Sequence, residues 1–186
     1  MSERPRGLGT DEIVQLLAAA AARPLFAGAA VSQLDHALQT AALLQHRYPD
    51  DPELAAAGLV HDIGHLLPGV GDAAHASAGA EVVRAALGAR VAGLVALHVE
   101  AKRYLVATEP GYGGGLGPDS VASLATQGGS ASPGEATAFA ALPLASVATA
   151  LRRADDSGKV EGLVVGDLPS WVPLLRGLSE RGAAGR

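Results

Sequence analysis

The segment LVHDIGHLL, residues 59–67, constrains the fold most strongly, because it places polar side chains inside an apolar run. His61, Asp62 and His65 stand where an ordinary protein core would carry more leucine. Burying these groups costs free energy unless each polar atom has a hydrogen-bond partner or a bound ligand. The segment therefore predicts a bound ion, or another strong polar partner, within the core.

The histidines as a group indicate a metal site. The chain has six histidines, and five of them lie on or next to the apolar faces of predicted helices: His36, His61, His65, His75 and His98. His46 stands beside Arg47 and is expected on the surface. A lone buried histidine is usually a hydrogen-bonded core residue, but five together need many partners, and a metal is the strongest one. Because the chain has no cysteine, imidazole and carboxylate would hold the metal, which suits iron, manganese or zinc, and the two oxygens of Asp62 could bridge two ions.

Helical patterns account for most of the chain. Apolar residues recur at helical spacing, and residues that favour helix starts precede several of these runs. Helices are expected to begin at Thr10 and Ser32, and others to cover about residues 52–63, 74–87 and 91–104, a short stretch from the capping box Ser132–Glu135, and about residues 143–159. No strand pattern or internal repeat is found. We therefore expect an all-α helical bundle.

The length of 186 residues suits one domain with a sizeable core. We expect a single domain over residues 1–186, with a frayed tail over residues 179–186. The glycine-rich segment TEPGYGGGLGPDS lacks the Lys-Ser/Thr ending of a phosphate-binding loop. This segment is expected to form a mobile flap.

Charge and hydropathy exclude several classes of protein. A formal charge of -5 and a pI near 5.6 argue against nucleic acid as the natural ligand. No apolar run approaches the roughly 20 residues that span a bilayer, and the start MSERPRGLGTDE lacks the apolar core of a signal peptide. We expect a cytoplasmic protein with no nucleic acid or membrane partner. The sequence does not indicate the oligomeric state.

The ordered series of motifs resembles one protein family. His36, the pair His61 and Asp62, and the distal Asp155 match the hallmark of the HD-domain superfamily, whose members are helical bundles. The segments QLDHALQTA, HDIGH, HVEAKRYL, SVASLATQGG, SPGEATAF and LRRADDSGK are similar to the mixed-valence diiron oxygenases of that superfamily. These enzymes are related to myo-inositol oxygenase and cleave carbon–phosphorus bonds in hydroxylated phosphonates. The segments extend over residues 31–160, which we expect to be the core of the domain.

The resemblance implies a ligand set for two irons. One iron would be held by His36, His61, Asp62 and Asp155, and the other by Asp62, His75 and His98. Asp155 is preferred to Asp156 because it stands four residues before Lys159, as the family's aspartate does. The residues expected to bind the phosphonate are His65, Lys102, Ser120, Arg152 and Lys159. Gln33 would orient a metal ligand or the substrate.

The resemblance also implies oxidative chemistry. A mixed-valence Fe(II)/Fe(III) pair with O2 as co-substrate would convert a 1-hydroxyphosphonate to a carboxylic acid and phosphate, and the substrate would supply the electrons. An iron and 2-oxoglutarate hydroxylase is the expected pathway partner, because it would install the C1 hydroxyl group.

The substituent on the phosphonate stays open. Family members that act on the aminoethyl compound have a tyrosine and a glutamate before the QLEH segment, and these residues hold the ammonium group. Here the stretch is PLFAGAAVSQLDH, in which Phe26 stands near the tyrosine and only alanine and glycine stand where the glutamate should be. The substrate could be hydroxymethylphosphonate or a quaternary amine resting against Phe26, or the pocket could be relaxed in its specificity.

Two other functions stay open at this point. An HD phosphohydrolase acting on a nucleotide or phosphate ester would use the same metal ligands, with a metal-bound water as the nucleophile. A non-catalytic ligand-binding HD domain is the second alternative, and the complete ligand set disfavours it. His65, Lys102 and Ser120 favour the oxygenase over the hydrolase.

Overall fold

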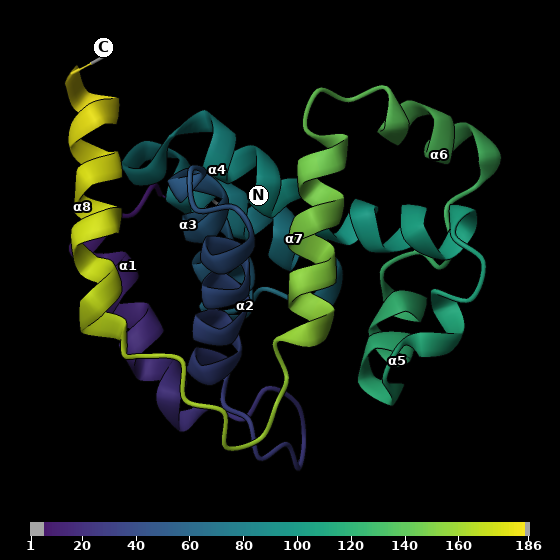
Figure 1. The fold of residues 1–186 in the computed structure, drawn as a ribbon, viewed down its shortest axis with the longest axis horizontal. Helices are drawn as coiled ribbons and strands as arrows, with labels where there is room; N and C mark the ends of the chain where they lie inside the picture. Colours follow the sequence, from purple (N-terminus) through teal and green to yellow (C-terminus); the bar gives the residue numbers. More distant parts are fainter. Residues whose placement is uncertain (1–5, 185–186) are drawn as a thin grey trace.

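Helices build the part of the chain that the computed structural model describes, residues 6–184 (Figure 1). Their bounds are α1 Thr10–Ala19, α2 Gln33–Arg47, α3 Pro52–Val60, α4 His75–Thr108, α5 Pro118–Thr126, α6 Pro133–Ala140, α7 Ala145–Ser157 and α8 Leu168–Ala184. Short 3₁₀ turns join them: η1 Ala20–Ala22, η2 Ile63–Leu66, η3 Asp72–Ala74 and η4 Gly113–Gly115. Within residues 6–184, β-type pairing is limited to one isolated bridge between Pro24 and Ser32. The predicted all-α fold is confirmed.

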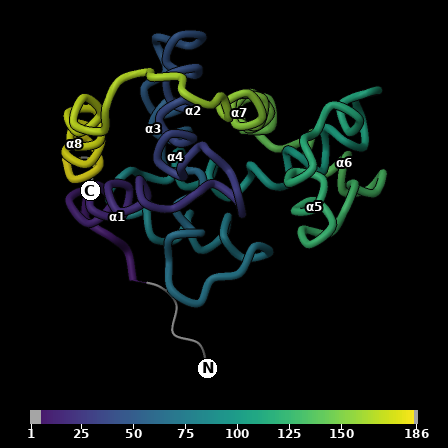
Figure 2. Tube along the Cα trace, turned by 90° about the horizontal axis from the view of Figure 1, so that it is seen from below, coloured from purple at the N-terminus to yellow at the C-terminus, as the bar shows by residue number. Residues whose placement is uncertain are grey.

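The centre of the fold consists of α2, α3, α4 and α7, which pack on one another. Helices α1 and α8 pack together at one end of the molecule, and α5 and α6 lie at the opposite end (Figures 1 and 2). Large side chains from five helices are at most 1% exposed: Leu44, Leu54, Leu94, Leu151 and Leu175. Burying one leucine side chain contributes roughly 1.5–3 kcal/mol. This core therefore holds the surrounding helices in a fixed arrangement.

The long helix α4 consists of two parts. Gly88 has a φ of 89°, which glycine adopts readily, and it interrupts the helix after residue 87. The two parts correspond to the helices predicted over residues 74–87 and 91–104. The stretch Asp72–Thr108 is apolar enough to span a membrane, but half of its most apolar window is buried inside the protein. The bend and the burial are those of a helix that packs in the protein core.

The structure differs from the sequence-based expectations at α3 and α5. α3 ends at Val60 rather than near Ile63, so that His61 and Asp62 lie in the turn before η2. Residues 118–126 form α5, with a proline in its first turn, where the glycine-rich loop was expected to continue to Ser120 and no helix was predicted. α5 has no buried residue. With nine residues and only two large apolar side chains, Val121 and Leu124, it is too short to give a clear helical pattern in the sequence.

The helix α8 is a third difference, because no helix was expected after residue 159. Its buried residues follow helical spacing: Leu168, Trp171, Leu175 and Leu178. Pro173 lies inside the helix, and a proline there usually argues against helical structure. Residues 179–184, expected to be frayed, form the last turns of α8. Residues 185–186 of the expected tail lie outside the described part of the chain.

Candidate metal centre

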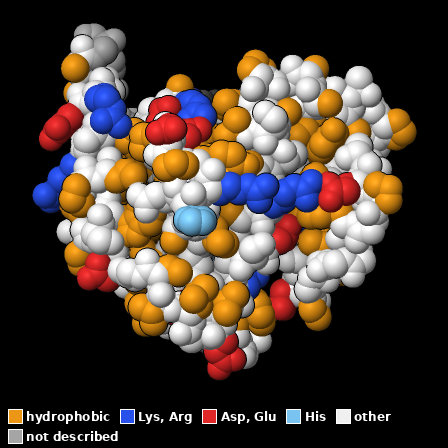
Figure 3. All heavy atoms as spheres, in the orientation of Figure 1, with side chains coloured by type: hydrophobic (Ala, Val, Ile, Leu, Met, Phe, Trp, Pro, Cys, Tyr) orange, Lys and Arg blue, Asp and Glu red, His pale blue; other side chains and the backbone are white. Residues whose placement is uncertain are grey.

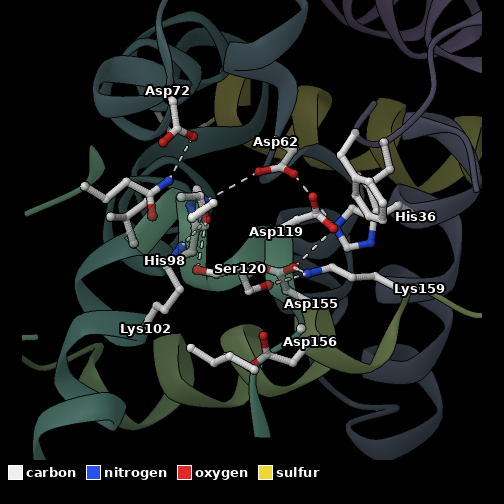
Figure 4. A pocket seen from close by; sticks show the side chains of 18 of the residues that line it. His36, Asp62, Asp72, His98, Lys102, Asp119, Ser120, Asp155, Asp156 and Lys159 are labelled. Carbon is white, nitrogen blue, oxygen red and sulfur yellow. Dashed lines mark hydrogen bonds and ion pairs between the residues drawn. The ribbon is translucent and has the colours of Figure 1, made fainter. Parts of the chain in front are cut away.

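Three helices and one turn bring the predicted metal ligands to a common point, as Figure 4 shows for several of them. The ligands are His36 on α2, His61 and Asp62 in the turn after α3, His75 and His98 on α4, and Asp155 on α7. The four histidines are at most 2% exposed. Polar groups buried this deeply need strong partners.

A backbone carbonyl holds the Nδ1 atom of each of these four histidines. The contacts are His36 to Gly158 at 2.7 Å, His61 to Gly58 at 2.8 Å, His75 to Asp72 at 2.5 Å and His98 to Val95 at 2.7 Å. A carbonyl oxygen only accepts hydrogen bonds, so each Nδ1 carries the proton and donates it. In the neutral ring the Nε2 atom is then an unprotonated acceptor. Histidines that bind a metal through Nε2 are oriented in this way.

The four Nε2 atoms form two close pairs on the two sides of Asp62. The Nε2 atoms of His36 and His61 are 3.2 Å apart, and they lie 3.8 and 3.5 Å from Asp62 Oδ2. The Nε2 atoms of His75 and His98 are 2.9 Å apart, and each lies 3.5 Å from Asp62 Oδ1. Unprotonated nitrogens at these distances repel each other unless a cation binds both. The arrangement fits two cations bridged by the Asp62 carboxylate.

The two candidate aspartates on α7 have different surroundings. Asp155 is 4% exposed, and its Oδ1 lies 3.3 Å from Nε2 of His36. Its Oδ2 lies 3.8 Å from Nε2 of His61. Asp156 instead accepts hydrogen bonds from Tyr112 and Arg152. The structure therefore places Asp155, and not Asp156, beside the first pair of histidines.

The protonation states suit metal binding at neutral pH. Burial lowers the pKa of His61 to about 4, and it lowers the pKa of His75 to about 4 as well. Burial alone would raise the pKa of Asp62, but the neighbouring His61 and His98 bring that pKa well below its ordinary value. For Asp155 burial is likewise outweighed, by Arg152 and Lys159. Neutral imidazoles and ionised carboxylates are the forms that bind metals.

A cavity of about 530 Å³ opens over these ligands. All the residues predicted to bind the substrate line it: Gln33, His65, Lys102, Ser120, Arg152 and Lys159. A cavity of this size lies within the roughly 300–1,000 Å³ of small-molecule sites. Phe26 also lines the cavity. The structure therefore brings the predicted metal ligands and the predicted substrate residues together in one site.

Each lysine of the cavity contacts a serine of α5. Lys102 donates to Ser123 Oγ at 2.8 Å, and Lys159 donates to Ser120 Oγ at 3.3 Å. Lys159 also lies 3.3 Å from Asp155 Oδ1. Lys102 is only 2% exposed. A buried lysine ammonium beside a cavity is suited to binding an anion.

His65 and Gln33 have more specific contacts than the sequence indicated. The ring of His65 stacks on that of His75, with centroids 3.9 Å apart. The amide of Gln33 donates to the carbonyl of Leu25 at 3.1 Å. Gln33 thereby fixes the loop that carries Phe26 at the cavity wall, rather than contacting a metal ligand.

Arg152 is held on three sides. Its Nη1 donates to Asp155 Oδ2 at 2.7 Å, its Nε donates to the hydroxyl of Tyr112 at 3.2 Å, and its Nη2 donates to Asp156. These bonds occupy most directions of the guanidinium group. Its main role in this structure is to hold Asp155 in place. The predicted contact of Arg152 with a substrate therefore stays a proposal.

The sequence neighbours of these cations, Arg103 and Arg153, serve other purposes. Arg103 donates to Glu135 at 2.7 Å, and Arg153 pairs with Glu109. On the face drawn in Figure 3, basic side chains form a short row that ends at acidic ones, among mixed apolar residues. These arginines link surface elements and do not add to the cavity.

Several residues at or beside the cavity were not predicted from the sequence, among them Asp72, Tyr112, Ser123 and Gln127. Ser123 lies one helical turn after Ser120, so the spacing could have indicated it. The partners of Asp72 and Tyr112 are far away in the sequence, and no local pattern marks them.

Comparisons with known proteins agree with this geometry. The HD domain model matches residues 34–155. The chain is 37% identical over 150 residues to the hydroxymethylphosphonate dioxygenase of Gimesia maris, over 76% of this chain and 74% of that protein. It is 30% identical over 164 residues to the (1-hydroxy-2-(trimethylamino)ethyl)phosphonate dioxygenase (glycine-betaine-forming) of Leisingera caerulea, over 84% of this chain and 83% of that protein. The chain therefore belongs to the HD-domain family, in the group that contains these phosphonate dioxygenases.

Proposed function

We propose that this protein is an O2-dependent oxygenase that cleaves the carbon–phosphorus bond of a 1-hydroxyphosphonate. The products are a carboxylic acid and inorganic phosphate. The observation that carries the proposal is the position of Asp62 between two pairs of unprotonated Nε2 atoms, beside a cavity that contains two lysines. Both relatives described above are named dioxygenases of phosphonates with a hydroxyl group on C1.

The reaction balances without an external reductant. Oxidation of the hydroxylated carbon to a carboxylic acid, with release of phosphate, removes four electrons from the substrate, and reduction of one O2 consumes four. The two irons, when bound, would supply activation of O2 and one-electron chemistry. The residues proposed to hold one iron are His36, His61, Asp62 and Asp155, and those for the other are Asp62, His75 and His98.

The charges of the cavity suit the phosphonate end of the substrate. Lys102, Lys159 and His65 would bind its oxygens, and Ser120 would add a hydroxyl donor. The lysines already lie at hydrogen-bond distance from hydroxyl oxygens of α5, so bonds to a phosphonate would need only small movements. Holding the phosphonate here would place C1 over the metal centre, which is a proximity effect.

We propose a substrate without a primary amine. The loop that contains Phe26 offers a phenyl ring and alanine or glycine, and Phe26 lines the cavity. Hydroxymethylphosphonate, or a phosphonate with a quaternary amine against the ring of Phe26, would suit this wall. A hydroxylase that uses iron and 2-oxoglutarate would be the enzyme that supplies the C1 hydroxyl group.

The test is purification without oxygen, metal counting, and a screen of 1-hydroxyphosphonates for phosphate release and O2 uptake. We expect two irons per chain, and one O2 consumed for each phosphate released. A phosphohydrolase would release phosphate from an ester without O2, and a non-catalytic domain would do neither. Phosphate release from a phosphate ester without O2, with no reaction of any 1-hydroxyphosphonate, would reject the proposal.

The pH dependence of substrate binding should report the protonation state of Lys102. Burial, assisted by the nearby Arg152, lowers the pKa of Lys102 to about 8. The ammonium form attracts a phosphonate and the neutral amine does not, so the cation is present below this pH and lost above it. Because kcat/KM reports the free enzyme, we expect kcat/KM to fall by roughly tenfold per pH unit above pH 8.

Lys102→Arg is the matched variant for this measurement, because its guanidinium group stays protonated. Its kcat/KM should be lower at neutral pH but should show no such fall near pH 8. The same fall in Lys102→Arg and in the unmodified protein would remove Lys102 from the binding site.

A further inference from the structure

The helix α5 is attached to the rest of the protein in an unusual way. None of its residues is buried, and Val121 is 49% exposed. The glycine-rich segment of residues 111–117 precedes it, and Gly128 and Gly129 follow it with φ angles of 98° and 73°. An apolar core therefore does not fix α5. Its position depends on a few polar contacts.

Asp72, in η3, makes one group of these contacts with residues at the C-terminal end of α5. The carboxylate of Asp72 accepts a hydrogen bond from Gln127 Nε2 at 3.0 Å and another from the hydroxyl of Thr126. The main-chain carbonyl of the same residue accepts the Nδ1 proton of His75 at 2.5 Å. Asp72 therefore holds α5 through its side chain and a proposed metal ligand through its backbone.

The other contacts lie along the cavity side of α5. They are the bonds from Lys102 to Ser123 and from Lys159 to Ser120 described above. Figure 4 shows Asp72, Ser120 and both lysines around the same cavity. Every side chain in these two groups except Thr126 lines that cavity. α5 thus forms one wall of the site and is held there by residues of the site.

We propose that α5 is a lid over the metal centre and that Asp72 is the positioning residue that holds it in register. When an anion binds Lys102 and Lys159, each ammonium group must bond to the anion as well as to its serine on α5. The lysine–serine bonds are then weaker and no longer fix the lid by themselves. The bonds of Asp72 to Thr126 and Gln127 remain. They keep the serine hydroxyls at the cavity while the lysines bind the anion.

The test is Asp72→Ala, which removes the side-chain contacts and leaves the main-chain bond to His75. In the substrate-free protein, we expect amide hydrogen exchange over residues 118–127 to become at least roughly tenfold faster, as for the loss of one hydrogen bond to a charged group. Exchange in α2 should not change. The variant should keep its metals, because no proposed ligand is altered.

Kinetics give a second readout, which rests on the proposed function. Asp72→Ala should raise the KM for the hydroxyphosphonate at least roughly tenfold and change kcat much less. The double variant Thr126→Val, Gln127→Leu removes the same contacts from the side of the lid and should have the same effects. Asp72→Asn keeps one acceptor oxygen and should restore part of the affinity. Asp50→Ala, at an exposed aspartate between α2 and α3, is the control and should do nothing.

The outcomes separate the lid from the reaction. Unchanged exchange over residues 118–127 in Asp72→Ala would overturn the proposal, whatever the activity. Loss of metal in that variant would also overturn it, because Asp72 would then act on the metal centre itself. Faster exchange with metals retained would support the lid even if no 1-hydroxyphosphonate were turned over by the unmodified protein, in which case only the proposed function would fail.

Discussion

Replacement of Asp62 by alanine is expected to abolish turnover and to remove metal from both halves of the centre. Each oxygen of Asp62 lies beside one pair of histidines, at 3.5 Å from His75 and His98 on one side and at 3.5 Å from His61 on the other. Losing a residue that only supports a ligand costs roughly 10–100-fold in metal affinity or activity. If Asp62 is shared by two ions as proposed, removing its carboxylate should therefore cost more than roughly 100-fold for each ion.

Metal counting by mass spectrometry, with O2 uptake on the active substrate, checks this prediction. His75→Ala is the comparison, because it removes a ligand from one half only and should leave one metal per chain with no turnover. Asp156→Asn is the matched carboxylate control, since Asp156 contacts Tyr112 and Arg152 rather than the histidines. It should keep both metals. Two metals and full turnover in Asp62→Ala would show that the carboxylate does not bridge.

The proposed metal ligands, which the structure brings close together, were assigned from the family resemblance, and all but His75 lie in the short motifs that carry it. The capping box of Ser32 and Asp35 starts α2 and sets the position of His36. Gly88 separates the two parts of α4 that carry His75 and His98. Local rules of helix formation therefore predicted the elements that carry these histidines, while the resemblance indicated which histidines would bind metal.

The contacts within the walls of the cavity could not be predicted in the same way, because they join residues that are distant in sequence. Asp72 and Gln127 are 55 residues apart, and Tyr112 and Arg152 are 40 residues apart. The resemblance indicated that Arg152 and Lys159 face one site, but it could not show that neighbouring acids hold Arg152. Tertiary packing decided which cations are available to a ligand.

Gly64 is another residue whose role depends on a tertiary contact that the sequence does not show. Its replacement is the second substitution for which we expect a large effect. The essential property of Gly64 is its lack of a side chain, which no pattern in the sequence indicates. A Cβ atom at Gly64 would lie 1.9 Å from the carbonyl oxygen of His75 and 2.6 Å from its carbonyl carbon. Favourable carbon contacts lie at about 3.5–4.0 Å. Both atoms belong to the main chain, so either η2 or the start of α4 must move to admit a methyl group.

Gly64→Ala is therefore expected to lower the free energy of unfolding of the metal-free protein by about 3 kcal/mol or more, at or above the upper end of the usual cost of overpacking. It should also impair metal binding, because the displaced segments carry Asp62 on one side and His75 on the other. Urea unfolding and metal counting check both effects. Gly71→Ala is the control, since a Cβ atom there would meet nothing within 4 Å. Gly64→Ala could instead unfold at the same urea concentration as the unmodified protein and keep its metals. The contact between η2 and α4 would then not hold the metal centre together, and the packing of the helix core alone would have to position the ligands.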